Sequence, residues 1–266
     1  NDQRVTVQPL VLRKGGAVVV SLDTMVFGET MRIRGEFESV DIAAFLGPTL
    51  PADLDIEGTV GGSFATSDSG LPISLIMRSD LVRIGDIALD SILLTGIMDD
   101  SGMYLDTIRA RESTRSRFTA NAAIPWPFFG SEVSEQDTMS GAVRISGDLL
   151  ASIEHNILSP VGGNGVGTVD ASFMGTEEGL MVTSLSARID SGFLKVTPYV
   201  PDGVSQFRMS MIMPDSARVI THMQGMIGRR SIEVNSTHRI PSGYRPFQFG
   251  PLNLGQTPAA ARRTAE

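Results

Sequence analysis

Three histidines, His155, His222 and His238, are the side chains of this chain best suited to proton transfer or metal binding. Imidazole titrates near neutral pH and binds divalent metals, so histidines at ligand spacing, as in H-E-x-x-H, would indicate a metal site. The three lie far apart in sequence and belong to no such pattern. We interpret them as surface residues, His155 on an expected helix and the other two on polar strand positions.

Two acidic pairs could hold a cation or act as an acid and a base. Asp53 and Asp55 are two residues apart on an expected strand, so both face the same side, which the alternation predicts to be solvated. Asp99 and Asp100 precede Ser101-Gly102, a composition typical of a hairpin turn. Both pairs are interpreted as structural.

A glycine-rich run at 162–167 (GGNGVG) is the remaining candidate for chemistry. A phosphate-binding loop opens a helix and carries Gly-Lys-Ser/Thr, whereas these glycines follow an expected helix and lead into an expected strand. We interpret them as a flexible connector. No Gly-x-Ser-x-Gly elbow is present. The sequence therefore predicts no enzyme, no catalytic residue, no metal and no cofactor.

Composition narrows the class of protein. The formal net charge of −8 and the pI near 5 argue against a nucleic-acid-binding surface. No cysteine is present, which excludes disulfides and fits passage through an oxidising compartment such as a bacterial periplasm. No apolar run is long enough for a membrane-spanning helix. The chain begins at Asn1 without an initiator Met or a signal peptide, so we expect a piece of a longer protein.

An internal repeat decides the expected architecture. Residues 58–64 (GTVGGSF), with Gly70-Leu71 following, recur as 167–173 (GTVDASF), with Gly179-Leu180 at the same distance. In the same order, 32–37 (RIRGEF) matches 144–149 (RISGDL) and 118–121 (FTAN) matches 232–235 (IEVN). Each unit ends on Ile-Pro, at 124–125 and 240–241. Units of about 110 residues that follow one another predict an elongated molecule.

Alternation with a period of two dominates both units and predicts strands with one apolar and one wet face. Turn sequences such as 99–102 (DDSG), 201–203 (PDG) and 214–216 (PDS) separate the strands. Each unit has one helical interruption: Ser39 is expected to cap a helix ending at Gly47-Pro48, and Asp148 one ending at Ser159-Pro160. The predicted fold is all-β with short helices, an elongated, curled antiparallel sheet shaped as a half-pipe.

The same pattern divides the chain. Residues 1–30 are expected to end a preceding unit, 31–125 to form the first unit and 143–241 the second. Residues 126–142 are expected to link the units, and 242–266 to form a loose tail rich in Pro, Gly, Ala and Arg.

A single meander has an apolar face and no second sheet in the sequence to cover it. Curling the sheet hides this face in a groove that suits aliphatic ligands. The methionines allow two interpretations, core filling or an adaptable surface that contacts acyl chains. The predicted groove residues are the alternating apolar positions Leu54, Ile56, Val60, Phe64, Phe118, Ile124, Val169, Phe173, Phe207, Met209, Met211 and Met213.

Residues 35–37 (GEF), 40–48 (VDIAAFLGP) and 54–60 (LDIEGTV), followed by alternating strands ending at 124–125, resemble the repeat region of TamB and AsmA-like envelope proteins. The resemblance covers both units. It implies a long β-groove ("β-taco") in the periplasm of a Gram-negative bacterium, in a protein anchored in the inner membrane and meeting an outer-membrane barrel protein elsewhere in its chain. It implies contact with phospholipid acyl chains and supplies no catalytic residue.

The expected function is thus a non-enzymatic groove for phospholipid transfer between membranes or for outer-membrane protein assembly. A structural or adhesive β-repeat whose apolar face packs against itself remains the alternative.

Overall fold

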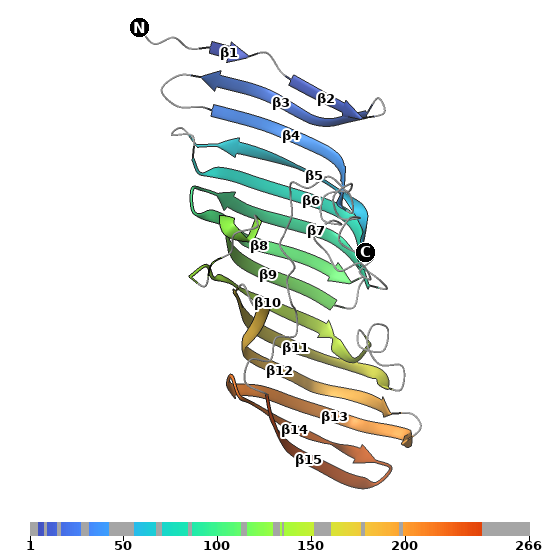
Figure 1. The fold of residues 1–266 in the computed structure, drawn as a ribbon. Helices are drawn as coiled ribbons and strands as arrows, with labels where there is room; N and C mark the ends of the chain where they lie inside the picture. Colours follow the sequence, from blue (N-terminus) through green and yellow to red (C-terminus); the bar gives the residue numbers. More distant parts are fainter. Residues whose placement is uncertain are drawn as a thin grey trace, which may run out of the picture.

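The computed structural model describes residues 5–7, 10–14, 17–27, 32–42, 56–67, 71–84, 87–112, 116–129, 134, 136–151, 161–176, 179–196 and 199–240. Leu54, Asp53, Asp55, His155, most of both predicted helices and the predicted tail lie outside these residues. The strands of the described part all belong to one sheet (Figure 1).

The first unit contributes six strands and the second unit six more. The bounds of the strands before and within the first unit are β1 Val5–Val7, β2 Leu10–Lys14, β3 Ala17–Phe27, β4 Arg32–Asp41, β5 Ile56–Thr66, β6 Ile73–Ile84, β7 Ile87–Met98, β8 Gly102–Glu112 and β9 Ser116–Pro125. Those of the second unit are β10 Met139–Asp148, β11 Val161–Thr176, β12 Gly179–Val196, β13 Val200–Asp215, β14 Arg218–Ile227 and β15 Arg230–Arg239.

The sheet is an antiparallel meander that does not close. From β3 to β15 each strand pairs with its sequence neighbour, and β1 and β15 end the path. Nine of the fourteen pairings contain a register shift. Each such bulge bends its strand and increases its twist. The predicted all-β, elongated and curled antiparallel sheet is confirmed.

Hydrogen bonds at equivalent turns support the repeat. The turn between β7 and β8 is closed by Asp99, whose Oδ1 accepts from Ser101 N at 2.8 Å. The turn between β13 and β14 has Asp215 in the same role, with Ala217 N at 3.0 Å. Trp126 N then donates to Ser101 O, and Ile240 N to Ala217 O. The hairpin predicted at 99–102 is confirmed.

Strand register corrects one equivalence drawn from the sequence. Gly35 pairs with Phe64, whereas in the second unit Gly141 pairs with Phe173. The counterpart of Gly35 is therefore Gly141, not Gly147, six residues further on. A shift by an even number keeps every side chain on the same face, so alternation alone cannot detect it.

The glycine-rich run predicted as a flexible connector is a strand. Residues 162–167 belong to β11 and pair with β12, Gly163 opposite Leu194 and Gly165 opposite Gly192. At Gly165 an added Cβ would lie 2.9 Å from Leu150 Cδ1 and 3.0 Å from Ile189 Cγ2. Glycine is present here because other side chains occupy the space above the strand, not because the backbone must bend.

The two predicted helix starts differ. Asp148 caps as expected: its Oδ1 accepts from Ala151 N at 3.3 Å, and residues 149–151 are helical. Ser39 does not cap a helix. It lies inside β4 with φ of 52°, at a register shift against β5, and the chain turns helical only at Ile42.

The expected linker contains structure at both ends. A 3-10 helix occupies Trp126–Phe129, and β10 begins at Met139 and pairs with β9. The two units are thus joined as neighbouring strands of one sheet.

Candidate functional site

One face of the sheet, here called the apolar face, carries uninterrupted hydrophobic rows across the strands. Residues that are partners in the register point to the same side, so each row can be followed from strand to strand. The longest row crosses β3 to β12 through Val20, Phe37, Gly62, Met77, Leu94, Ile108, Ala120, Val143, Ala171 and Leu185. A second row crosses β8 to β13 through Ala110, Phe118, Ile145, Val169, Ala187 and Met211.

The described members of the predicted groove set lie together on the apolar face. By register and alternation this face holds Ile56, Val60, Phe64, Phe118, Ile124, Val169, Phe173, Phe207, Met209, Met211 and Met213. Met209 is also the register partner of Met223 on β14. The sequence-derived set omitted the equally apolar positions on β6 to β8, such as Met77, Leu94 and Ile108. Their alternation was the signal that could have found them.

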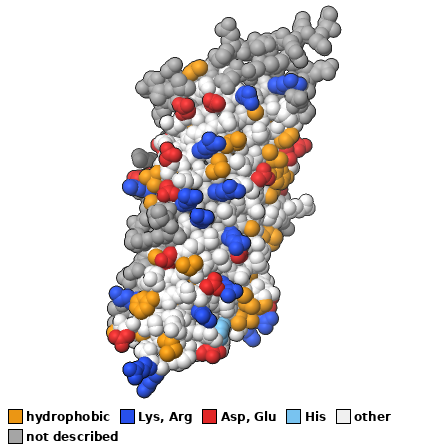
Figure 2. Space-filling model, turned by 180° about the vertical axis from the view of Figure 1, so that it is seen from behind, with side chains coloured by type: hydrophobic (Ala, Val, Ile, Leu, Met, Phe, Trp, Pro, Cys, Tyr) orange, Lys and Arg blue, Asp and Glu red, His pale blue; other side chains and the backbone are white. Residues whose placement is uncertain are grey.

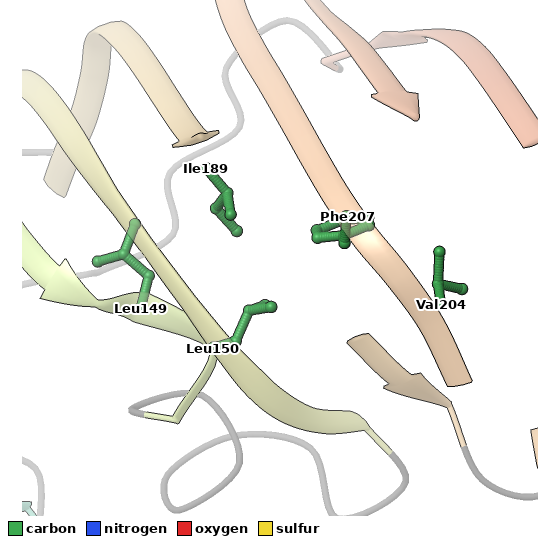
Figure 3. Packing of buried hydrophobic residues seen from close by; sticks show 5 residues of the cluster. All are labelled: Leu149, Leu150, Ile189, Val204 and Phe207. Atoms are coloured by element: carbon green, nitrogen blue, oxygen red, sulfur yellow. The ribbon is translucent and has the colours of Figure 1, made fainter. Parts of the chain in front are cut away.

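In the second unit the apolar face is covered locally. Leu149 and Leu150, directly after β10, pack with Ile189, Val204 and Phe207 into a buried cluster (Figure 3). Ile189 is 2% exposed and Phe207 4%. The sequence carries no local signal for this cluster, because the cluster forms between a helix start and strands that lie far away in the chain.

Asp148 positions this cover through two hydrogen bonds. Besides capping residue 151, Asp148 Oδ1 accepts from Gly165 N at 2.7 Å. The same oxygen thus ties the start of the helix to β11. Because Gly165 has no side chain, Leu150 can lie directly on the strand next to Ile189.

In the first unit, the connection between β4 and β5 lies largely outside the described residues, and aromatic rings are the prominent feature of the described apolar face. Phe64 lies over Gly35 of the neighbouring strand, where an added Cβ would be 2.7 Å from the Cζ atom of the ring. Phe37 lies over Gly62 in the same way, at 2.8 Å. Both rings remain half-buried. Val82, the counterpart of Ile189 by register, is buried.

The opposite face, here called the polar face, is charged and exposed. One of its rows runs Arg109, Thr119, Arg144 and Asp170 across β8 to β11. Arg144 Nε and Asp170 Oδ1 are 3.6 Å apart, and both side chains are more than half exposed, so the pair adds little stability. Figure 2, the view from behind, shows basic and acidic side chains along the length of the molecule.

The titratable groups with shifted pKa values belong to turns. The pKa of Asp99 is lowered by the hydrogen bond from the Ser101 hydroxyl and then by that from the Ser101 backbone. The pKa of Asp215 is lowered chiefly by its hydrogen bond from the Arg218 side chain, which in turn raises the pKa of Arg218. These carboxylates close hairpins and do not converge on a common site.

The two described histidines lie on surface strands, as predicted. His222 Nδ1 is 2.5 Å from Asn235 Oδ1 and 3.8 Å from Glu233 Oε1. Within the described residues, no group of three or more His, Cys, Asp or Glu side chains is arranged to hold a metal ion. The part of the chain that the structure describes also contains no helix long and apolar enough to span a bilayer.

Comparison of this chain with models of known protein families, with characterised proteins and with solved structures gave no match.

Proposed function

We propose that this chain is a non-enzymatic, groove-forming segment that contacts lipid acyl chains along the apolar face. The observation that carries the proposal is the apolar row from Val20 on β3 to Leu185 on β12, which no polar side chain interrupts. All described strands belong to one sheet, so none of them forms a second layer over this face.

The energetics favour an aliphatic ligand. Removing acyl methylenes from water gains about 0.8 kcal/mol for each CH₂, without any directional polar contact. A contiguous apolar surface that is left to water is unusual in a monomeric protein and typically marks a binding surface. The flexible methionines on β13 and β14 suit chains of varied shape.

The cellular setting is part of the same proposal. The resemblance of residues 35–60 to the TamB and AsmA-like repeat region supports a periplasmic segment of an envelope protein, with phospholipid as the cargo and an outer-membrane barrel protein as a partner of other parts of the chain. The acidic composition argues against a nucleic-acid partner.

A structural repeat module is the second candidate, favoured by one observation. Leu149 and Leu150 close over Ile189 and Phe207, so part of the apolar face packs against the chain itself. If the whole face were covered in this way, no ligand would be needed.

The deciding experiment is lipid analysis of the chain expressed in a Gram-negative host, by native mass spectrometry together with extraction of bound lipid. The groove predicts co-purifying phospholipid. A stable, lipid-free protein would contradict the groove and support the structural module.

Two substitutions sharpen this test. Phe173→Asp and Met211→Asp place a charge on half-buried positions of the apolar face. In an open groove the sheet still folds and phospholipid is lost. In a closed, self-packed core the same charge is buried without a partner and the domain unfolds. A folded variant with undiminished lipid would contradict the groove.

A further inference from the structure

The second unit extends its sheet at one end. Strands β11, β12 and β13 are 16, 18 and 16 residues long, against 11, 12 and 12 for their counterparts β5, β6 and β7. Register runs to the end of the extension, with Val196 opposite Val200. The hairpin of β12 and β13 therefore projects as ordered sheet beyond the first unit's outline (Figure 1).

The outer part of this hairpin exposes apolar and aromatic side chains. Tyr199, in the turn, is 83% exposed, and Val166 on the neighbouring β11 is 64% exposed. Phe193 is 38% exposed, with its ring over Gly203. Tyr199 is exposed at the tip of the hairpin, and no apolar neighbour among the described residues covers it. Its side chain therefore presents an apolar ring with a polar end. Such rings favour the boundary between membrane and water.

Basic side chains accompany these rings. Lys195 is exposed on β12, and so are Arg229, in the turn between β14 and β15, and Arg230, the first residue of β15. This turn lies at the same end of the sheet, since Ser205 pairs with Met226 and Ile227 with Arg230 (Figure 1). Residues 191–203 and 227–231 contain these three basic residues and only one acidic residue, Asp202. The chain as a whole has a net charge of −8, so this end is basic by comparison.

The first unit lacks this combination. Its corresponding turn joins β6, ending at Ile84, directly to β7, beginning at Ile87, and the two residues between them are Gly85 and Asp86. Phe193, Lys195 and Tyr199 thus belong to the extension, whereas Arg229 and Arg230 lie at the β14–β15 turn, whose counterpart between β8 and β9 is flanked by Arg111 and Arg117.

We propose that the hairpin tip, defined as Phe193, Lys195 and Tyr199 together with Arg229 and Arg230, docks on the surface of an anionic lipid bilayer. The basic side chains attract anionic headgroups, and the rings enter the interfacial layer. The docking goes beyond contact of acyl chains with the apolar face. It needs no lipid in the groove, because the tip residues Phe193 and Lys195 point to the polar side of the sheet, as the register of Phe193 with Asn164 shows.

Vesicle flotation of the full chain tests the proposal. Vesicles of phosphatidylcholine alone are compared with vesicles that also contain phosphatidylglycerol, at low and at physiological salt. We expect binding to the anionic vesicles that weakens as salt increases. Absence of binding, or equal binding to both kinds of vesicle, would overturn the proposal.

Matched variants locate the contact. Lys195→Gln/Arg229→Gln/Arg230→Gln is expected to lower the partition coefficient by roughly tenfold to a hundredfold. The control Arg78→Gln/Arg109→Gln/Arg144→Gln removes three exposed arginines from the interiors of β6, β8 and β10, away from the strand ends, and should leave binding nearly unchanged. An equal loss in both triple variants would assign binding to general charge and refute the tip.

The aromatic contribution has its own readout. Tyr199→Trp should show a blue-shifted tryptophan emission on anionic vesicles, whereas the wild type, with Trp126 alone, should not. Tyr199→Ser should weaken flotation without affecting folding, because the ring is exposed. An unshifted emission maximum would contradict insertion. Co-purified lipid, measured separately, reports on the groove, so either proposal can fail alone.

Discussion

The two units have the same six-strand plan and bury their apolar faces differently. In both units an aromatic ring lies over a glycine of the neighbouring strand and stays half-buried, Phe64 over Gly35 and Phe173 over Gly141. In the second unit, Leu149 and Leu150 descend onto Ile189 and Phe207 and exclude water. In the second unit, the contacts that close the core come from the connection between β10 and β11, where Leu149 and Leu150 lie.

The largest expected effect tests the closed core. Ile189→Ala should destabilise the protein by about 3 kcal/mol, because the cluster around it cannot collapse into the cavity, whereas Val82→Ala at the counterpart position should cost about half as much. Urea unfolding with matched m-values measures both. Val→Ala deletes one carbon fewer than Ile→Ala, so equal costs would contradict the tighter packing around Ile189.

The next prediction concerns the glycines beneath the aromatic rings. Gly141→Ala and Gly35→Ala should each destabilise by about 2 kcal/mol, because the added methyl meets the ring of the neighbouring strand and a backbone carbonyl. In the Gly141→Ala background, Phe173→Leu should recover part of the loss. A cost at only one of the two glycines would contradict their equivalence.

A smaller effect is expected from exchanging a cross-strand pair between the units. Phe37 faces Gly62 in the first unit, and Val143 faces Ala171 at the same place in the second. Gly62→Ala alone should be destabilising, because the added methyl meets Ile76 O on the neighbouring strand as well as the Phe37 ring. Phe37→Val added to it relieves only the contact with the ring and should restore about 1 kcal/mol. A double-mutant cycle measures this coupling. If the effects of the two substitutions on stability were strictly additive, the pair Val143 and Ala171 would not be an alternative to the pair Phe37 and Gly62 at this site.

The smallest expected effect concerns the turns. The pKa values of Asp99 and Asp215 are lower in the folded chain than the ordinary value of 3.8. A lowered pKa means that the ionised form stabilises the fold above pH 3.8, and that this contribution disappears as the pH falls through the folded-state pKa.

Asp99→Asn and Asp215→Asn should therefore flatten the decline of stability in acid, each by a small amount because both groups are exposed. Salt should weaken the contribution of Asp215, which is paired with Arg218, more than that of Asp99, which is held by Ser101. Unfolding measured against pH and salt separates the two turns. An identical response to salt would contradict the difference.

Much of the fold could be predicted because its signals are local. Alternation over strands such as β9 and β13, with turns such as 99–102, indicates an antiparallel meander, and the recurrence of 58–64 as 167–173 indicates its repetition. Asp148 was predicted as a cap because capping requires only a carboxylate before an apolar stripe.

The errors have one physical origin. The glycines of 162–167 suggest a connector because glycine lowers strand propensity, and the reason for Gly165 appears only when Leu150 and Ile189 occupy the space above it. The equivalence of Gly35 with Gly147 failed because a shift of six residues preserves alternation, and only the pairing partner distinguishes the two registers.

By itself the sequence determined that the chain forms strands, that they repeat, and which side of each strand is apolar, because these properties depend on residues two positions apart. The tertiary structure decided which strand lies opposite which, where the apolar face is covered by Leu149 and Leu150, and that Tyr199, Lys195 and Arg229 meet at one end of the sheet. Those outcomes depend on contacts between residues far apart in the chain, and only the folded register brings such residues together.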